Sequence, residues 1–132
     1  MNRQIKFRGQ NIKGEWHYGL LSHNKDVDSD YEWFISNKAG KPFAFGAIEK
    51  SIGQFTGLYD KNGKEIFEGD VLEAGMELAM IFEVYWKDGG FRYKNTDESV
   101  DISFSGHNHL HSILSRFHVI GNVFENPDLV KL

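Results

Sequence analysis

The chain has 132 residues, no cysteine, a formal net charge of −4, and a hydrophobic fraction of 40% that includes 14% aromatic residues. This composition excludes a disordered chain and a disulfide scaffold, and no apolar run approaches the roughly 18 residues of a membrane helix. We therefore expect a soluble, cytoplasmic protein with no membrane partner. A single domain over residues 1–132 is expected, with a subdivision into residues 1–50 and residues 51–125 as the alternative.

Strands are predicted throughout the first third of the chain, because apolar and polar residues alternate there with a period of two. The alternating stretches are Ile5–Arg8, Trp16–Leu20, Tyr31–Ser36 and Phe43–Ala47. Each is expected to bury one face, and most aromatic residues of this region are expected in the core. These aromatic residues are Trp16, Tyr18, Tyr31, Trp33, Phe34, Phe43 and Phe45.

Turn chemistry dominates the middle of the chain. The Asn62–Gly63 pair predicts a hairpin, since both residues tolerate positive φ. Asp70, directly after Gly69, is expected to accept backbone N–H groups and to fix a second turn. The glycines at Asp88–Gly90 separate two further strands. The strands predicted for this half are Phe55–Tyr59, Glu65–Phe67, Val71–Leu72, Leu78–Trp86, Phe91–Lys94 and His118–Val123.

Helix is scarce, and the one predicted helix spans roughly residues 107–116, where Leu110 and Leu114 share a face with Ile113. Short strands and tight turns at spacings of about ten residues predict a mainly β fold. A small barrel or sandwich is favoured over βαβ units.

The histidine cluster His107, His109 and His111 is the first candidate for chemistry. On a helix His107 and His111 have the spacing of metal ligands, and on a strand all three share a face. However, Asn108 stands where a zincin motif needs glutamate, and structural zinc sites usually recruit cysteine. A His-rich polar segment is therefore the favoured interpretation, and no metal or cofactor is assigned.

The other patterns also fall short of a site. The acidic run Asp26, Asp28, Asp30 and Glu32 lacks the glycine and glutamate of a calcium loop. The glycines form no phosphate loop, and the serines at 103, 105, 112 and 115 form no nucleophile elbow. Carboxylates such as Glu65, Glu68 and Asp70 are common in an acidic chain. No catalytic, cofactor-binding or metal residue is assigned.

Three segments, Ile5–Arg8, Gln54–Val71 and Val119–Pro127, resemble in this order the signatures of the YopX-like family of phages and prophages. The chain departs from the family pattern after Arg8, where Gly9-Gln10-Asn11 follows, and in its histidine cluster. The resemblance implies N-terminal strands packed with an SH3-like small barrel in the C-terminal half, and an origin in a phage or prophage. It implies no activity, cofactor or catalytic residue.

Three hypotheses for function follow. The first is a non-catalytic module that binds a host or phage protein or forms a homo-oligomer, because exposed aromatic residues anchor interfaces. The second is nucleic-acid binding through the acid-free segment with Arg3, Lys6, Arg8 and Lys13. Residues 67–132, with 5 Lys/Arg against 11 Asp/Glu, count against it. The third is a metal-dependent enzyme built on His107, His109 and His111.

Overall fold

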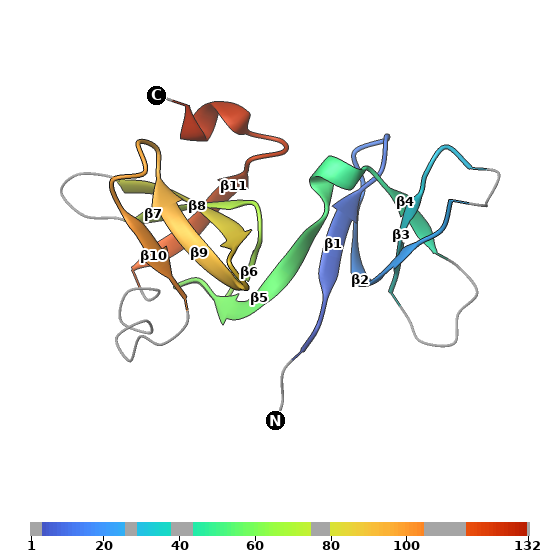
Figure 1. Cartoon of the computed structure of the whole chain (residues 1–132), viewed down its shortest axis with the longest axis horizontal. Coiled ribbons are helices and arrows are strands. Elements are labelled where there is room, and N and C mark those ends of the chain that lie inside the picture. The colour runs from blue at the N-terminus through green and yellow to red at the C-terminus, as the bar shows by residue number, and fades with distance from the viewer. Residues whose placement is uncertain (1–3, 26–28, 38–43, 75–79, 105–115, 132) are drawn as a thin grey trace. The chain divides into compact units, whose positions relative to one another are not determined.

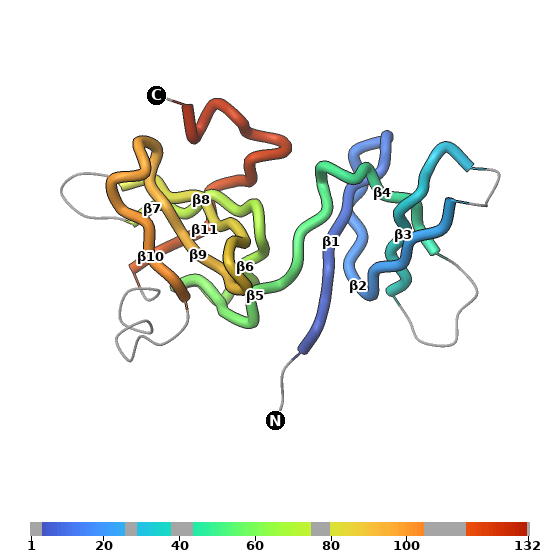
Figure 2. Tube along the Cα trace, in the orientation of Figure 1, coloured from blue at the N-terminus to red at the C-terminus, as the bar shows by residue number. Residues whose placement is uncertain are grey.

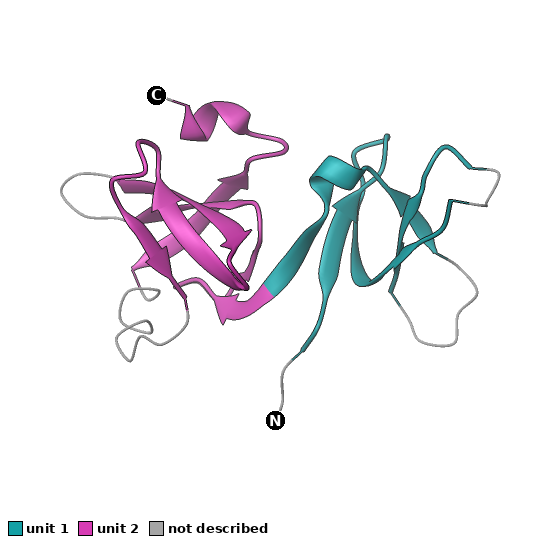
Figure 3. Cartoon of the chain, viewed as in Figure 1, with its two compact units in different colours: residues 1–55 teal, residues 56–132 magenta. Residues whose placement is uncertain are grey.

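The computed structural model describes residues 4–25, 29–37, 44–74, 80–104 and 116–131, which form two antiparallel sheets (Figure 1). The mainly β class is thus confirmed, and the helix predicted at 107–116 lies outside the described residues. The chain divides into two compact units, unit 1 at residues 1–55 and unit 2 at residues 56–132 (Figure 3). Whether they act as one domain stays a prediction.

The first sheet has the strand order β4-β3-β2-β1-β5-β6, with β6 at Glu65–Phe67, and its strands from β4 to the start of β5 belong to unit 1. Its elements are β1 (Phe7–Gln10), β2 (Trp16–His23), β3 (Trp33–Ser36), β4 (Phe45–Ala47), the 3-10 helix η1 (Glu49–Ser51) and the start of β5 (Gly53–Tyr59). The chain after β4 returns to β1, where the N–H of Ile48 donates to the carbonyl of Gln10 at 2.8 Å. Ile35 and Ala47, at 0% and 3% exposure, lie on the covered face of this sheet.

The burial expected for the aromatic stretch of β2 is wrong. Tyr18 is 43% exposed and Leu20 is 58% exposed. The register explains this, because Leu21 pairs with the buried Ile35, so the odd-numbered residues of this part of β2 face the covered side. The other described aromatic residues expected in the core are also half-buried or exposed: Trp16, Tyr31, Trp33, Phe34 and Phe45. The predicted strand is correct, but its apolar face is the open one.

The sheet of unit 2 has the order β10-β9-β8-β7-β11. Its strands are β7 (Asp70–Ala74), β8 (Met80–Lys87), β9 (Gly90–Asn95), β10 (Asp101–Ser103) and β11 (Phe117–Asn122), with η2 (Pro127–Val130) after them. The predicted turn between β8 and β9 is confirmed. Asp88 and Gly89 have φ of 52° and 81°, and Lys87 pairs with Gly90, as in a two-residue turn with positive φ at both positions.

Strand β5 runs from unit 1 into unit 2, and the chain then turns into β6 (Glu65–Phe67) (Figure 2). Within unit 1, Gly53 and Gln54 pair with β1. Within unit 2, the hydroxyl of Thr56 donates to the carbonyl of Ile66 at 2.8 Å. The hairpin predicted around Asn62–Gly63 is therefore the first connection between strands within unit 2.

Unit 2 has a continuous hydrophobic core built from alternate residues of its strands. Phe82 packs edge-on against Tyr93, with ring centroids 5.4 Å apart, and lies 5.3 Å from Phe117. The buried cluster consists of Ile66, Leu72, Ala74, Phe82, Val84, Phe91, Tyr93, Phe104 and Phe117. Among the described strands, the first and last of this sheet do not pair, so the SH3-like barrel stays a prediction.

Candidate functional site

The turn between β5 and β6 is built around the carboxylate of Asp60. One carboxylate oxygen accepts the N–H groups of Asn62 and Lys64, each at 2.8 Å, and the other accepts the N–H of Val119 at 2.9 Å. Burial alone would raise the pKa of Asp60, but the backbone hydrogen bonds and the charge of Lys64 lower it below its ordinary value. This signature aspartate therefore has a structural role.

Two further signature residues, Asp70 and Asn122, also stabilise turns. Asp70 accepts the N–H of Phe67 at 2.7 Å with 1% exposure, which confirms the turn role predicted for it. In the C-terminal signature, the side-chain oxygen of Asn122 accepts the N–H of Glu125 at 2.8 Å, and its amide donates to the Glu125 carboxylate at 3.0 Å. Asp60, Asp70 and Asn122 of the two long signatures thus shape turns.

A polar network lies on the outer face of β8, β9 and β10 and consists of Tyr85, Arg92 and Asp101. The hydroxyl of Tyr85 donates to one carboxylate oxygen of Asp101. The Nε of Arg92 donates to the other at 2.9 Å, and its Nη2 donates to the Asp101 carbonyl at 3.1 Å. All three side chains are therefore held in one arrangement across three strands.

The electrostatics of this polar network oppose proton transfer at neutral pH. The hydrogen bond to Asp101 raises the pKa of Tyr85 and that of Arg92, and the hydrogen bond from Tyr85 lowers the pKa of Asp101. General acid–base catalysis works best with a pKa near the working pH. These shifts instead keep the tyrosine neutral and the ion pair charged, which suits recognition better than catalysis.

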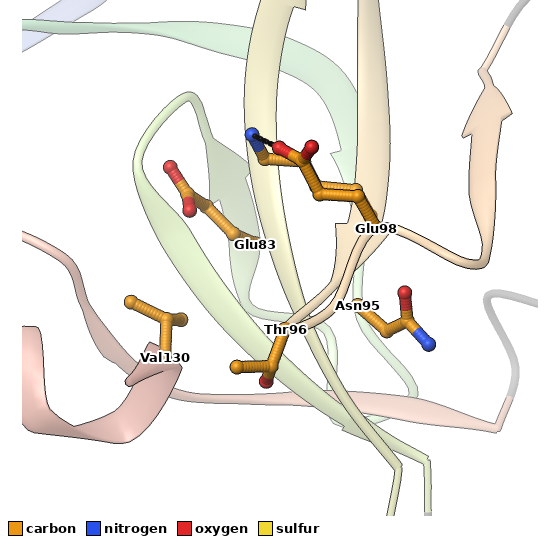
Figure 4. Close-up of a pocket in the computed structure, with 6 residues that line it drawn as sticks. Glu83, Asn95, Thr96, Glu98 and Val130 are labelled. Carbon is orange, nitrogen blue, oxygen red and sulfur yellow. Dashed lines mark hydrogen bonds and ion pairs between the residues drawn. The ribbon is translucent and has the colours of Figure 1, made fainter. Parts of the chain in front are cut away.

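A small pocket of about 90 Å³ adjoins this network (Figure 4). It is lined by Glu83, Lys94, Asn95, Thr96, Glu98 and Val130. The ammonium group of Lys94 already has two partners in this pocket. Its Nζ lies 2.7 Å from the Glu98 carboxylate and 4.5 Å from the centroid of the Tyr85 ring. The hydrogen bond with Glu98 raises the pKa of Lys94, so this ion pair is present at neutral pH.

Unit 1 carries a second, larger depression, of about 210 Å³, between the start of β1 and the neighbouring strands. We call it the β2 depression, and it is lined by Gln4, Ile5, Lys6, Gly19, Leu20, Ser36 and Asn37. Ile5 is 56% exposed and Leu20 58% exposed. Gly19 packs closely against the end of β3, because a Cβ there would lie 2.1 Å from the carbonyl oxygen of Ser36.

Basic and aromatic side chains meet beside this depression. The Nζ of Lys6 lies 5.2 Å from the centroid of the Phe55 ring, and the guanidinium of Arg8 lies 5.1 Å from that of Trp16. Arg8 is only 8% exposed, although it is charged. The basic N-terminal segment predicted from the sequence is thus partly packed against aromatic rings, where cation–π attraction holds it.

The histidines predicted as metal ligands, His107, His109 and His111, lie outside the described residues. Within the described ranges, no group of three or more His, Cys, Asp or Glu side chains is placed to hold a metal ion. His17 stacks on Phe45 with ring centroids 4.0 Å apart, and His23 lies 4.4 Å from Trp33. These two histidines therefore pack against aromatic rings of β4 and β3.

The acidic run predicted as a solvated loop is described only in part, since residues 26–28 lie outside the described ranges. Its last member, Glu32, lies 3.4 Å from Nε2 of His23. This contact joins the end of β2 to the residue before β3. Both side chains are exposed, so it contributes little to stability.

Comparisons with known proteins found similarity over nearly the whole chain. The YopX protein family matches residues 6–131, which include both units. Among solved structures, the chain is similar to protein EF1440 from Enterococcus faecalis. The two share 27% identity and a TM-score of 0.58, over 98% of this chain and 100% of that one. The comparison with curated proteins returned no match. In the part of the chain that is described, no helix has the length and apolarity to cross a membrane.

Proposed function

We propose that this chain, which belongs to the YopX family, is a non-catalytic protein-interaction module of a phage or prophage. The observation that carries the proposal is the β2 depression, where Ile5 and Leu20 present more than half of their surface to solvent. Large apolar side chains grouped on an open face are typical of binding sites. The phage setting rests on the resemblance of the signatures, and the cytoplasm of a bacterial host is the expected location.

The contrast between the two long signatures and the β2 depression supports this proposal. The signature residues Asp60, Asp70 and Asn122 spend their hydrogen-bonding groups on turns. Leu20 and Ile5 lie outside these turns, and a change at either leaves the turns intact. Residues that hold turns in one part of the chain and an apolar surface displayed in another are the arrangement expected of an interaction module.

The test is capture of a partner by the full chain, expressed in the phage-bearing host and treated with nuclease. Leu20→Arg places a charge in the depression, and we expect it to reduce the captured protein at least tenfold, as hot-spot changes do. Ile12→Arg is the matched control, because Ile12 is 73% exposed and lies outside the depression. Equal capture by the wild type and by Leu20→Arg would contradict the proposal.

Nucleic-acid binding ranks second, supported by the aromatic and basic side chains of β1 and β2. The burial of Arg8 against Trp16 weakens this alternative, since that guanidinium has little surface to offer a phosphate. A partner list that disappears after nuclease treatment would favour the alternative over the proposal.

A further inference from the structure

We propose that the β2 depression binds an extended segment of a partner protein in which one apolar side chain is flanked by a carboxylate. The apolar side chain enters between Ile5 and Leu20, and the carboxylate pairs with Lys6. This inference rests on the proposed function, and it adds the chemistry of the partner.

The size of the depression sets the kind of occupant. Its volume of about 210 Å³ lies below the roughly 300–1,000 Å³ of pockets that enclose drug-sized ligands. It suits a single large side chain, which would contact the apolar side chains of Ile5 and Leu20.

The polar lining sets the conformation of the occupant. Gln4, Ser36 and Asn37 carry neutral groups that donate and accept hydrogen bonds. Such groups match the N–H and C=O groups of an extended peptide, which has no internal hydrogen bonds of its own. A helical occupant would satisfy its backbone internally and would form no backbone hydrogen bonds with these lining groups.

The charge of the lining determines which residues flank the apolar side chain of the occupant. Lys6 is the one charged residue among those that line the depression, and none of the lining residues is acidic. The first 14 residues likewise contain Arg3, Lys6, Arg8 and Lys13 and no acid. A carboxylate beside the apolar anchor is therefore attracted to this surface, and a basic flank is repelled.

The test is selection of a displayed library of random seven-residue peptides on the full chain. We expect the enriched peptides to share one large apolar residue with Asp or Glu within two positions. Leu20→Arg should weaken binding of the selected peptide at least tenfold, and Ile12→Arg should leave it unchanged. Lys6→Glu should weaken binding about two- to fivefold, and Lys13→Glu, at an exposed site outside the depression, should not.

Enrichment of basic flanks, equal binding to Leu20→Arg, or no enrichment over the Leu20→Arg chain would each overturn the inference. Binding of an oligothymidine probe that depends on Leu20 and Lys6 would overturn it too, by assigning the surface to nucleic acid. The capture experiment separates the two proposals. If Leu20-dependent capture of a protein holds while the library yields no acidic flank, only this inference fails.

Discussion

In unit 2 the alternating strands place their apolar residues in a core, whereas in unit 1 a similar alternation leaves part of its apolar residues open. Phe82 and Val84 of β8 are 4% and 0% exposed, but Tyr18 and Leu20 of β2 are 43% and 58% exposed. Both strands are eight residues long and have a neighbour on each side in their sheets. The comparison teaches that alternation identifies a strand, while the face that is covered depends on what packs against it.

The largest expected effect breaks the core of unit 2. Phe82→Ala removes a buried ring that contacts Tyr93 and Phe117, and should lower the free energy of unfolding by about 3–5 kcal/mol. Leu20→Ala in unit 1 should change it by about 0.5 kcal/mol or less, because Leu20 is already exposed. Urea unfolding followed by circular dichroism measures both. Similar losses for the two variants would mean that Leu20 is covered in solution.

The next effect concerns the turn that begins unit 2. Asp60→Asn removes the charge that accepts three backbone N–H groups, and we expect a loss of about 2–3 kcal/mol in the free energy of unfolding. Asp128→Asn is the control, since that side chain is 92% exposed and should change stability by less than about 0.5 kcal/mol. Thermal and urea unfolding of the two variants check this. A loss as small as that of the control would contradict the structural role of Asp60.

The same carboxylate predicts how stability changes with pH. The pKa of Asp60 in the folded chain is below its ordinary value of 3.8. Its contribution is therefore complete above that ordinary value and is lost as the pH falls through the folded pKa. The stability difference between wild type and Asp60→Asn should be constant from pH 7 to about pH 4 and shrink below it. A difference that persists unchanged into stronger acid would contradict this assignment.

A smaller effect is expected in unit 1, at the contact between Gly46 and Tyr31. A Cβ at Gly46 would lie 2.2 Å from the Tyr31 ring, so Gly46→Ala must displace the ring from β4. We expect a loss of about 1–3 kcal/mol. The control is Gly90→Ala in unit 2, where a Cβ meets nothing within 4 Å. Unfolding curves that are equal for both variants would mean that Tyr31 does not cover Gly46 in solution.

The smallest effect is a titration in the polar network of unit 2. The hydrogen bond to Asp101 raises the pKa of Tyr85 above its ordinary value of 10.0, so Asp101→Asn should return it toward that value. Ultraviolet absorbance against pH, taken as a difference from Tyr85→Phe, isolates this tyrosine. Asp97→Asn is the control and should leave the titration unchanged. A Tyr85 titration that is insensitive to Asp101→Asn would exclude the hydrogen bond in solution.

Most strands and turns could be predicted from the sequence, because their causes are local. The two predicted turns are present, although Asn62 does not have positive φ and only Gly63 does, at 80°. In the second turn Asp88 and Gly89 both have positive φ, and Asp70 caps a turn three residues away. Strand β10 and the 3-10 helices η1 and η2 were not predicted, since no apolar alternation or helical spacing marks these short segments. The link from Asp60 to Val119 was also missed, because it joins residues 59 positions apart.

The candidate site was predictable only in outline. Exposed aromatic residues and a basic N-terminal segment pointed to the first third of the chain, but Tyr18 and its neighbours were expected mostly in the core. The β2 depression combines residues from the start of the chain, from β2 and from the end of β3. No sequence pattern indicates that Ile5, Gly19 and Ser36 lie close together, so the lining of the depression could not be predicted from the sequence.

The sequence by itself determined the family, the mainly β class and the positions of the turns, because these depend on residue types at short spacing. The tertiary structure decided which face of β2 is open, how Asp60 holds β11, and where Ile5 and Leu20 form a depression with Lys6. The physical reason is that burial depends on what packs against a strand. In this YopX chain, β2 presents to solvent the apolar face that its alternation alone would have assigned to a core.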